Sequence, residues 1–182
     1  MEEPQPIVVD ACVAINLRAS ERWSDVFRAG GWSPLMPSIA LGEVLYLFDD
    51  DGERTRVSFT EFVKAGELHS CELGADQLEL MLSMAAKLGA GEAAAIALAH
   101  SRGLPLATDD RAARRHPLAK ACRQITTPEL IQAWADRARP GPETIGRVLA
   151  MIETRASYRP RRDHPNAAWW EGFRAPRMSY LD

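Results

Sequence analysis

The chain has 182 residues, of which 46% are hydrophobic, a net charge of −3 and three cysteines. This length suits one domain with a well-formed core. The sequence lacks an apolar run of about 18 residues and a basic, apolar leader, so we expect no membrane span, no secretory signal and a cytoplasmic protein. The cysteines are odd in number and widely spaced, which argues against a disulfide framework and a zinc knuckle.

The charges are unevenly distributed along the chain. Residues 1–110 carry 8 Lys or Arg against 18 Asp or Glu, whereas residues 111–182 carry 14 against 7. This split is typical either of a cation-binding face beside an anion-binding face, or of solvated helix faces scattered without pattern.

Strand and helix signals alternate from the start of the chain. Ile7–Asp10 is a β-branched run that predicts a strand, and Ala11–Leu17 predicts a helix after it. Leu35–Ser38 and the following run Ile39–Phe48 predict a second strand that leads into a second helix. Glu43 is expected in the first turns of that helix.

The same alternation continues toward the carboxyl terminus. The signals predict an exposed turn, a short helix, a third strand, two helices, a fourth strand, a fifth strand and two helices, at residues 49–52, 59–65, 67–73, 76–88, 91–99, 104–108, 121–125, 128–138 and 143–155. Thr127 and Pro128 are expected to cap and open the helix at 128–138. The pattern predicts an α/β domain over residues 1–138, with a helix and an Arg- and aromatic-rich tail at 139–182 packed on it.

Acidic residues follow two of the predicted strands. Asp10 ends the first strand, and Asp109 and Asp110 follow the fourth. Ligands of parallel α/β sheets bind at the carboxyl ends of strands where the strand order reverses, so these acids face one another if the two strands are neighbours. Glu43 and Glu92 are two further acids among apolar neighbours. Because buried carboxylates need a neutralising cation, the four positions predict a magnesium or manganese site for a phosphoryl or phosphodiester reaction.

Each of these acids also has a structural explanation when it is taken alone. Asp10 and Asp109 could cap helices, and Glu43 could pair with an arginine such as Arg28. Glu92 could be a first-turn acid that the helix dipole favours. Their common placement in a strand–helix pattern favours a site.

Four segments, in their order and separation, resemble the PIN-domain nucleases, particularly the VapC-like toxins and related short prokaryotic PIN proteins. The segments, within residues 6–130, are VVDACVAINL, LGEVLYL, GAGEAAAIALA and LATDDRAAR. The resemblance implies a three-layer α/β/α sandwich with a central parallel sheet, here with a C-terminal helical extension. It also implies a metal-dependent endoribonuclease that cleaves single-stranded RNA. An antitoxin protein and a second copy of the chain are the partners that it implies beside RNA.

Carried over position by position, the resemblance implies that Asp10, Glu43, Glu92 and Asp110 are the catalytic acids. Asp10 and Asp110 are expected to ligate one or two Mg²⁺ or Mn²⁺ ions directly. Glu43 and Glu92 are expected to hold waters on the metal. Asp109 fills the variable position of a T-x-D pattern, so as a metal ligand it either coordinates or only adds charge.

Arginines directly after the last acids are the first candidates to bind the RNA backbone. They are Arg111, Arg114 and Arg115, on a predicted helix whose alternative role is a solvated face. Trp169 and Trp170 could stack on unpaired bases, but aromatic residues in a tail favour packing onto the domain.

Many PIN-domain nucleases carry a serine or threonine at the position of Cys12. Whether Cys12 makes a hydrogen bond that orients the site is therefore an open question at this point. Two other functions compete with a nuclease. One is a catalytically silent PIN-like scaffold that binds protein or RNA. The other is a phosphatase with an aspartyl nucleophile, a class that commonly carries a second acid where this chain has Cys12.

Overall fold

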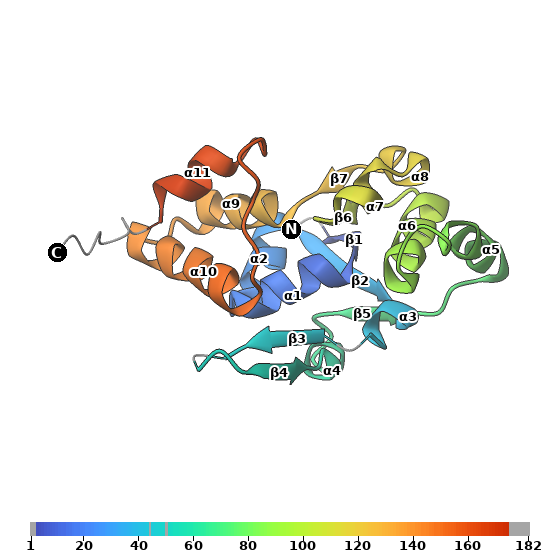
Figure 1. Ribbon diagram of the computed structural model, residues 1–182, viewed down its shortest axis with the longest axis horizontal. Coiled ribbons are helices and arrows are strands. Elements are labelled where there is room, and N and C mark those ends of the chain that lie inside the picture. The colour runs from blue at the N-terminus through green and yellow to red at the C-terminus, as the bar shows by residue number, and fades with distance from the viewer. Residues whose placement is uncertain (1–2, 44, 50, 175–182) are drawn as a thin grey trace.

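A computed structural model describes residues 3–43, 45–49 and 51–174, and a five-stranded sheet forms its centre (Figure 1). All neighbouring strands are parallel, in the order β5-β2-β1-β6-β7. These strands are β1 (Gln5–Val9), β2 (Trp32–Pro37), β5 (His69–Cys71), β6 (Leu106–Ala107) and β7 (Gln124–Ile125). The predicted α/β architecture with a parallel sheet is therefore confirmed. The strand order reverses at β1, which lies between β2 and β6.

Helices cover both faces of the sheet, as the alternating side chains of β1 require. Ile7 and Val9 join a core with one group of helices, whereas Val8 joins a second core on the opposite face. The first group is α1 (Ala11–Ala19), α2 (Trp23–Gly30), α9 (Thr127–Ala138) and α10 (Pro142–Arg155). The second is α5 (Ala75–Met84), α6 (Ala90–Arg102) and α8 (Pro117–Lys120). A one-residue slip of β1 would exchange its buried faces, so this packing fixes the register.

Small side chains bring α6 close to the sheet. Every residue of the segment Ala93–Ala99 is buried, and this segment packs against Val8 and Leu106. Gly103 ends the helix with a left-handed backbone (φ 63°), a conformation that glycine adopts without steric cost. The helix predicted at 91–99 and its stop near residue 103 are confirmed.

The helix predicted within Ile39–Phe48 is wrong for most of its length. Only one turn forms, α3 (Ser38–Leu41), and Glu43 lies beyond it. The chain then forms an antiparallel hairpin of β3 (Leu45–Phe48) and β4 (Arg54–Val57), followed by α4 (Thr60–Lys64). Leu, Tyr and Phe are compatible with helix and strand alike, and the pairing with β4 decides between them.

The carboxyl-terminal segment packs on the same core as the sheet. Helix α10 packs against α1, and α11 (Ala167–Gly172), which the sequence did not predict, buries Trp170 completely in the core of Ile7 and Val9. The predicted packing of the tail aromatics is confirmed for Trp170. Residues 175–182 of the predicted tail lie outside the described residues.

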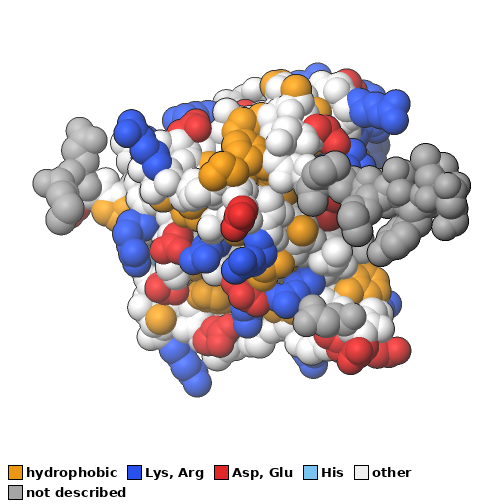
Figure 2. Space-filling model, turned by 90° about the vertical axis from the view of Figure 1, so that its left-hand side faces the viewer, with side chains coloured by type: hydrophobic (Ala, Val, Ile, Leu, Met, Phe, Trp, Pro, Cys, Tyr) orange, Lys and Arg blue, Asp and Glu red, His pale blue; other side chains and the backbone are white. Residues whose placement is uncertain are grey.

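The basic side chains of the second half are paired with acids on much of the face that α10 and α11 present. Figure 2 shows Lys and Arg intermixed with Asp and Glu over this face. Two of the ion pairs behind this mixture join Arg174 to Glu153 and Arg155 to Glu21. Scattered charge, rather than one basic surface, therefore describes this side of the molecule.

No helix in the described part of the chain has the length and apolar character needed to cross a membrane.

Candidate functional site

Asp10 lies at the carboxyl end of the central strand and is buried, with 1% of its surface exposed. Its Oδ1 accepts a hydrogen bond from the backbone N–H of Ala11 (2.7 Å), which caps α1. Its Oδ2 accepts from the Thr108 hydroxyl (2.8 Å) and the Cys12 thiol (3.2 Å). Burial raises the pKa of Asp10, these three hydrogen bonds oppose the rise, and the negative charge of Asp110 adds to it.

Thr108 connects Asp10 to Asp110. Strands β1 and β6 are parallel neighbours with Val9 opposite Ala107, so the residues after each strand meet at one edge of the sheet. While the Thr108 hydroxyl donates to Asp10, it accepts the backbone N–H of Asp110 (3.2 Å). The two strands are therefore neighbours, which is the condition on which the predicted approach of these acids rested, and Thr108 joins Asp10 to Asp110.

Asp110 also begins α7 (Arg111–Arg115). Its Oδ1 accepts the backbone N–H of Ala113 (2.7 Å), which is a helix N-cap. Asp10 and Asp110 therefore both cap helices. For Asp10 this is the structural role that was considered as an alternative to a metal site. Capping occupies Oδ1 of Asp110 and leaves Oδ2 without a hydrogen bond from any described residue.

Cys12 makes the orienting contacts that the sequence left open. Its thiol donates to Asp10, and its sulfur accepts the backbone N–H of Asp109 (3.3 Å). Burial and the charges of Asp10 and Asp109 raise the pKa of Cys12 well above the ordinary value of a thiol. The neutral thiol therefore substitutes for a hydroxyl between β1 and the loop after β6.

Glu43 and Glu92 are brought together by the start of α6. Oε1 of Glu43 accepts the backbone N–H of Gly91 (2.8 Å), and Oε2 of Glu92 accepts that of Gly89 (3.1 Å) in the first turn of the same helix. A Cβ atom at Gly91 would lie 2.2 Å from Oε1 of Glu43, so this approach requires glycine. The second oxygen of each glutamate accepts no hydrogen bond from the described residues.

Electrostatics joins the two pairs into one group, which we call the acid cluster: Asp10, Glu43, Glu92 and Asp110. Burial raises the pKa of Glu92, and repulsion from Asp110, Asp10 and Glu43 raises it further. Among the described residues no Lys, Arg or His forms an ion pair with any member. Arg28, considered as a partner of Glu43, instead lies 3.9 Å from Asp25.

The donor set of the acid cluster fits a divalent cation in chemistry and in charge. Its free carboxylate oxygens are the ligands that Mg²⁺ and Mn²⁺ prefer, and its mutual repulsion lacks a cationic partner within the described residues. As the side chains stand, no three His, Cys, Asp or Glu residues of the described chain form a metal-holding group. Each of the four members directs one oxygen to a backbone N–H of its own chain.

Asp109 has a different environment from the acid cluster. Its Oδ1 accepts the backbone N–H of Thr127 (2.9 Å) and the hydroxyl of Tyr158 (3.0 Å). Its Oδ2 accepts the Thr127 hydroxyl (2.5 Å) and the Asn16 amide (2.9 Å). Burial raises the pKa of Asp109, and these four donors lower it. The carboxylate is thus fixed by neutral donors from α1, α9 and the tail.

The three candidate RNA-binding arginines on α7 differ from one another. Arg111 and Arg115 are exposed and make no ion pair within the described residues. The Nε of Arg114 donates to the side chain of Gln124 (3.2 Å), and Gln124 donates back to the carbonyl of Arg114 (2.9 Å). Arg114 therefore joins α7 to β7.

Several residues that shape the site were not predicted from the sequence. Asn16 could have been noticed as an amide in the apolar run VAINL, and it is 2% exposed in the structure. Thr108 belongs to the segment LATDDRAAR, but the pattern assigned no role to its hydroxyl. Tyr158 carried no signal, because its partner Asp109 is 49 residues away. The helix at 128–138 is capped by Thr126, one residue before the expected Thr127.

The chain matches no protein-family model, no curated protein and no solved structure.

Proposed function

We propose that the protein is a metal-dependent endoribonuclease that cleaves phosphodiester bonds of single-stranded RNA at the acid cluster. The observation that carries this proposal is a pair of acids, Asp10 and Asp110, joined through Thr108 at the carboxyl edge of the sheet where the strand order reverses. Glu43 and Glu92 both accept N–H groups at the start of α6, and none of the four acids has a cationic partner among the described residues. Ligands of parallel α/β sheets bind at this place. The resemblance of four segments to the PIN-domain nucleases supports the same activity.

The side chains divide the work according to their environments. Asp10 and Asp110, linked through Thr108, would present carboxylate oxygens to Mg²⁺ or Mn²⁺ from one side. Glu43 and Glu92 would use their free oxygens to accept hydrogen bonds from water. The ion, when bound, supplies neutralisation of phosphate charge and a lowered pKa of water. Asp109 would position the loop that carries Asp110, since each of its oxygens already accepts two hydrogen bonds, whereas Oδ1 of Asp10 accepts one.

Arg111 and Arg115 would contact substrate phosphates. Both are exposed, and they lie on the helix that Asp110 begins. Phosphate contacts from arginine position a strand without reading its sequence. Arg114 is held by Gln124 and would act only through the placement of α7.

A catalytically silent scaffold is the second candidate function. It is favoured by the spacing of the acids, which form no metal-holding group within the described residues as they stand. In that case the acid cluster would bind a basic partner directly. Calorimetric titration separates the two functions, because a scaffold binds neither Mg²⁺ nor Mn²⁺ at the acid cluster.

The proposal is tested by cleavage of single-stranded RNA with Mg²⁺ or Mn²⁺ and with EDTA. We expect Asp10→Asn and Asp110→Asn each to lower the cleavage rate by at least about 100-fold, and EDTA to abolish cleavage. Asp76→Asn is the matched control, because this acid also lies in the first turn of a helix but is exposed and does not belong to the acid cluster. Full activity of either site variant would refute the assignment.

A further inference from the structure

The β3–β4 hairpin begins next to the acid cluster. Glu43 precedes β3 by two residues, and it lines one hollow together with Arg56 and Val57 of β4. Leu45 and Val57 pair across the strands and pack on the core, while Tyr46 pairs with Arg56 on the opposite face. Successive side chains of a strand alternate between faces, which places Arg56 away from the core.

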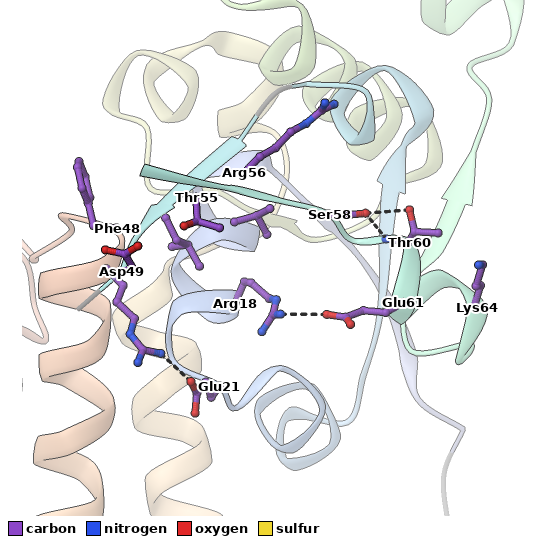
Figure 3. A pocket seen from close by; sticks show the side chains of 13 residues that line it. Arg18, Glu21, Phe48, Asp49, Thr55, Arg56, Ser58, Thr60, Glu61 and Lys64 are labelled. Carbon is purple, nitrogen blue, oxygen red and sulfur yellow. Dashed lines mark hydrogen bonds and ion pairs between the residues drawn. The ribbon is translucent and has the colours of Figure 1, made fainter. Parts of the chain in front are cut away.

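Two hollows adjoin at the end of β4 and together form what we call the hairpin groove. The first, of about 590 Å³, is lined by Glu43 and by residues that follow β4. The second, of about 680 Å³, extends to Arg18 and Lys64 and is drawn in Figure 3. The residues that line both hollows are Arg56, Val57, Ser58 and Thr60. The groove therefore runs from the acid cluster across the start of α4.

Arg56 is the only cation that lines both hollows, and its side chain has no ion pair or hydrogen bond with the described residues. The other arginines nearby are engaged. Arg18 lies 3.0 Å from Glu61, and the guanidinium of Arg54 lies 4.3 Å from the ring centre of Tyr46. Figure 3 shows Arg56 extending away from the Arg18–Glu61 pair.

The remaining charges of the larger hollow favour an anion. Arg18 and Arg155 pair with Glu61 and Glu21, and Oδ1 of Asp49 accepts backbone N–H groups of the hairpin turn. Lys64 is exposed and forms no ion pair with a described residue. Arg56 and Lys64 therefore have no anionic partner among the described residues. A guanidinium such as that of Arg56 can bind two phosphate oxygens through two parallel N–H groups.

We propose that the hairpin groove binds the sugar–phosphate backbone of single-stranded RNA beside the acid cluster, with Arg56 contacting a phosphate where the hollows meet. This inference rests on the proposed nuclease function. Phosphates that approach four carboxylates are repelled, and Arg56 is the cation that shares a hollow with Glu43. Each hollow has the volume of a small-molecule site, which suits single nucleotide units rather than a duplex.

The test measures the affinity of the full chain for a fluorescent single-stranded RNA in EDTA, so that binding is separated from cleavage. We expect Arg56→Gln to weaken binding roughly 5- to 10-fold and to reduce the slope of log affinity against log salt by about 0.7, the value for one phosphate contact. Arg54→Gln removes the same charge from the same strand and lies outside both hollows, so we expect its affinity to stay within about twofold of wild type. Arg56→Lys should retain part of the affinity, since the charge remains.

Three other outcomes are each decisive. If the wild-type protein binds and cleaves RNA but Arg56→Gln binds it equally well, the groove is not the RNA site and the nuclease proposal stands. If Arg54→Gln weakens binding as much as Arg56→Gln, the loss reflects the net charge of the protein rather than a contact in the hairpin groove. That result would also overturn the groove as the RNA site. If the wild-type protein binds no RNA and cleaves none, both proposals fail. Thermal melting of each variant verifies that it is folded.

Discussion

The backbone N–H of Gly91 donates a 2.8 Å hydrogen bond to Oε1 of Glu43, and this bond joins the chain after α3 to the first turn of α6. It holds a carboxylate against a helix start, where the helix dipole stabilises negative charge. The contact leaves the other oxygen of Glu43 without a donor among the described residues. A backbone atom therefore determines where this acid lies.

Gly91→Ala should displace Glu43 while leaving the fold intact. The new Cβ would lie 2.2 Å from Oε1 and 2.7 Å from Cδ of Glu43, so the carboxylate must move. We expect the cleavage rate to fall roughly 10- to 100-fold. Alanine favours a helix interior over glycine by about 1 kcal/mol, which offsets the lost hydrogen bond, so the melting temperature should change little.

Gly89→Ala is the control for that substitution. Its Cβ would meet Glu92 at 3.6 Å, an ordinary contact, and cleavage should continue at close to the wild-type rate. Alanine is a poorer N-cap than glycine, so this variant should be the less stable of the two. Equal cleavage by the two variants would contradict the role of Gly91.

Cys12→Ser and Cys12→Ala should differ in their effect on cleavage. A serine hydroxyl can donate to Asp10 and accept the N–H of Asp109 as the thiol does, so cleavage should be retained. Alanine removes both contacts, and we expect a loss of roughly 10-fold in rate and about 1 kcal/mol in stability. Rates and urea denaturation of the two variants are compared directly. Loss of activity in the serine variant would show that the sulfur itself is needed.

Tyr158→Phe should reveal how far the tail supports the site. The substitution removes the hydroxyl that donates to Asp109 and retains the ring, which lies edge-on to Trp170. We expect the free energy of unfolding to fall by about 1–2 kcal/mol and cleavage to decrease, because Asp109 adjoins Asp110. Tyr46→Phe is the control, since that ring is 41% exposed and its hydroxyl bonds to no described residue. Identical denaturation midpoints for the two variants would show that the Tyr158 hydroxyl does not stabilise the site.

Glu92→Gln should stabilise the protein in EDTA although it removes one of the four carboxylates of the acid cluster. Burial and the charges of Asp110, Asp10 and Glu43 raise the pKa of Glu92, so its ionised form is unfavourable in the folded state. Gln retains an oxygen for the Gly89 N–H. We expect a gain of about 0.5 kcal/mol at neutral pH, a value typical of solvent-screened charge interactions. A loss of stability would contradict the repulsion.

The direction in which pH changes the stability of the protein follows from the raised pKa of Glu92. A carboxyl whose pKa is raised on folding binds protons more readily in the folded state, so stability increases as the pH falls through that pKa toward the ordinary value. As the pH falls from neutrality toward 4.5, the ordinary value of a glutamate, the melting temperature of the wild type in EDTA should therefore gain more than that of Glu92→Gln. Glu79→Gln, an exposed change on α5, should behave like the wild type.

The sheet and the meeting of its acids could be predicted because their signals are local. Ile7–Asp10 is a short β-branched run that ends in an acid, and Leu104–Thr108 is a short, mostly apolar run directly before Asp109. The hairpin could not be predicted in this way. Leu45–Phe48 is apolar throughout, and only its pairing with Arg54–Val57 makes it a strand.

The partners of the individual carboxylates were also beyond the sequence. Asp109 and Asp110 are adjacent and chemically identical, yet one is held by Asn16 and Tyr158 and the other lies beside Asp10. Which of two neighbouring side chains points inward depends on contacts with distant elements. Sequence patterns therefore located the acids but could not show that Asp109 and Asp110 have different environments.

The pairing of β1 with β6 has a consequence for biosynthesis. The ribosome releases Val8 long before its partner Leu106, and Tyr158 follows later still. Contacts between segments so far apart must overcome the entropy of closing a long loop, and they form slowly. In the nascent chain the edge of β1 that faces β6 therefore stays unpaired until Leu106 and Ala107 have been made, and the acid cluster cannot assemble before Asp110 follows them.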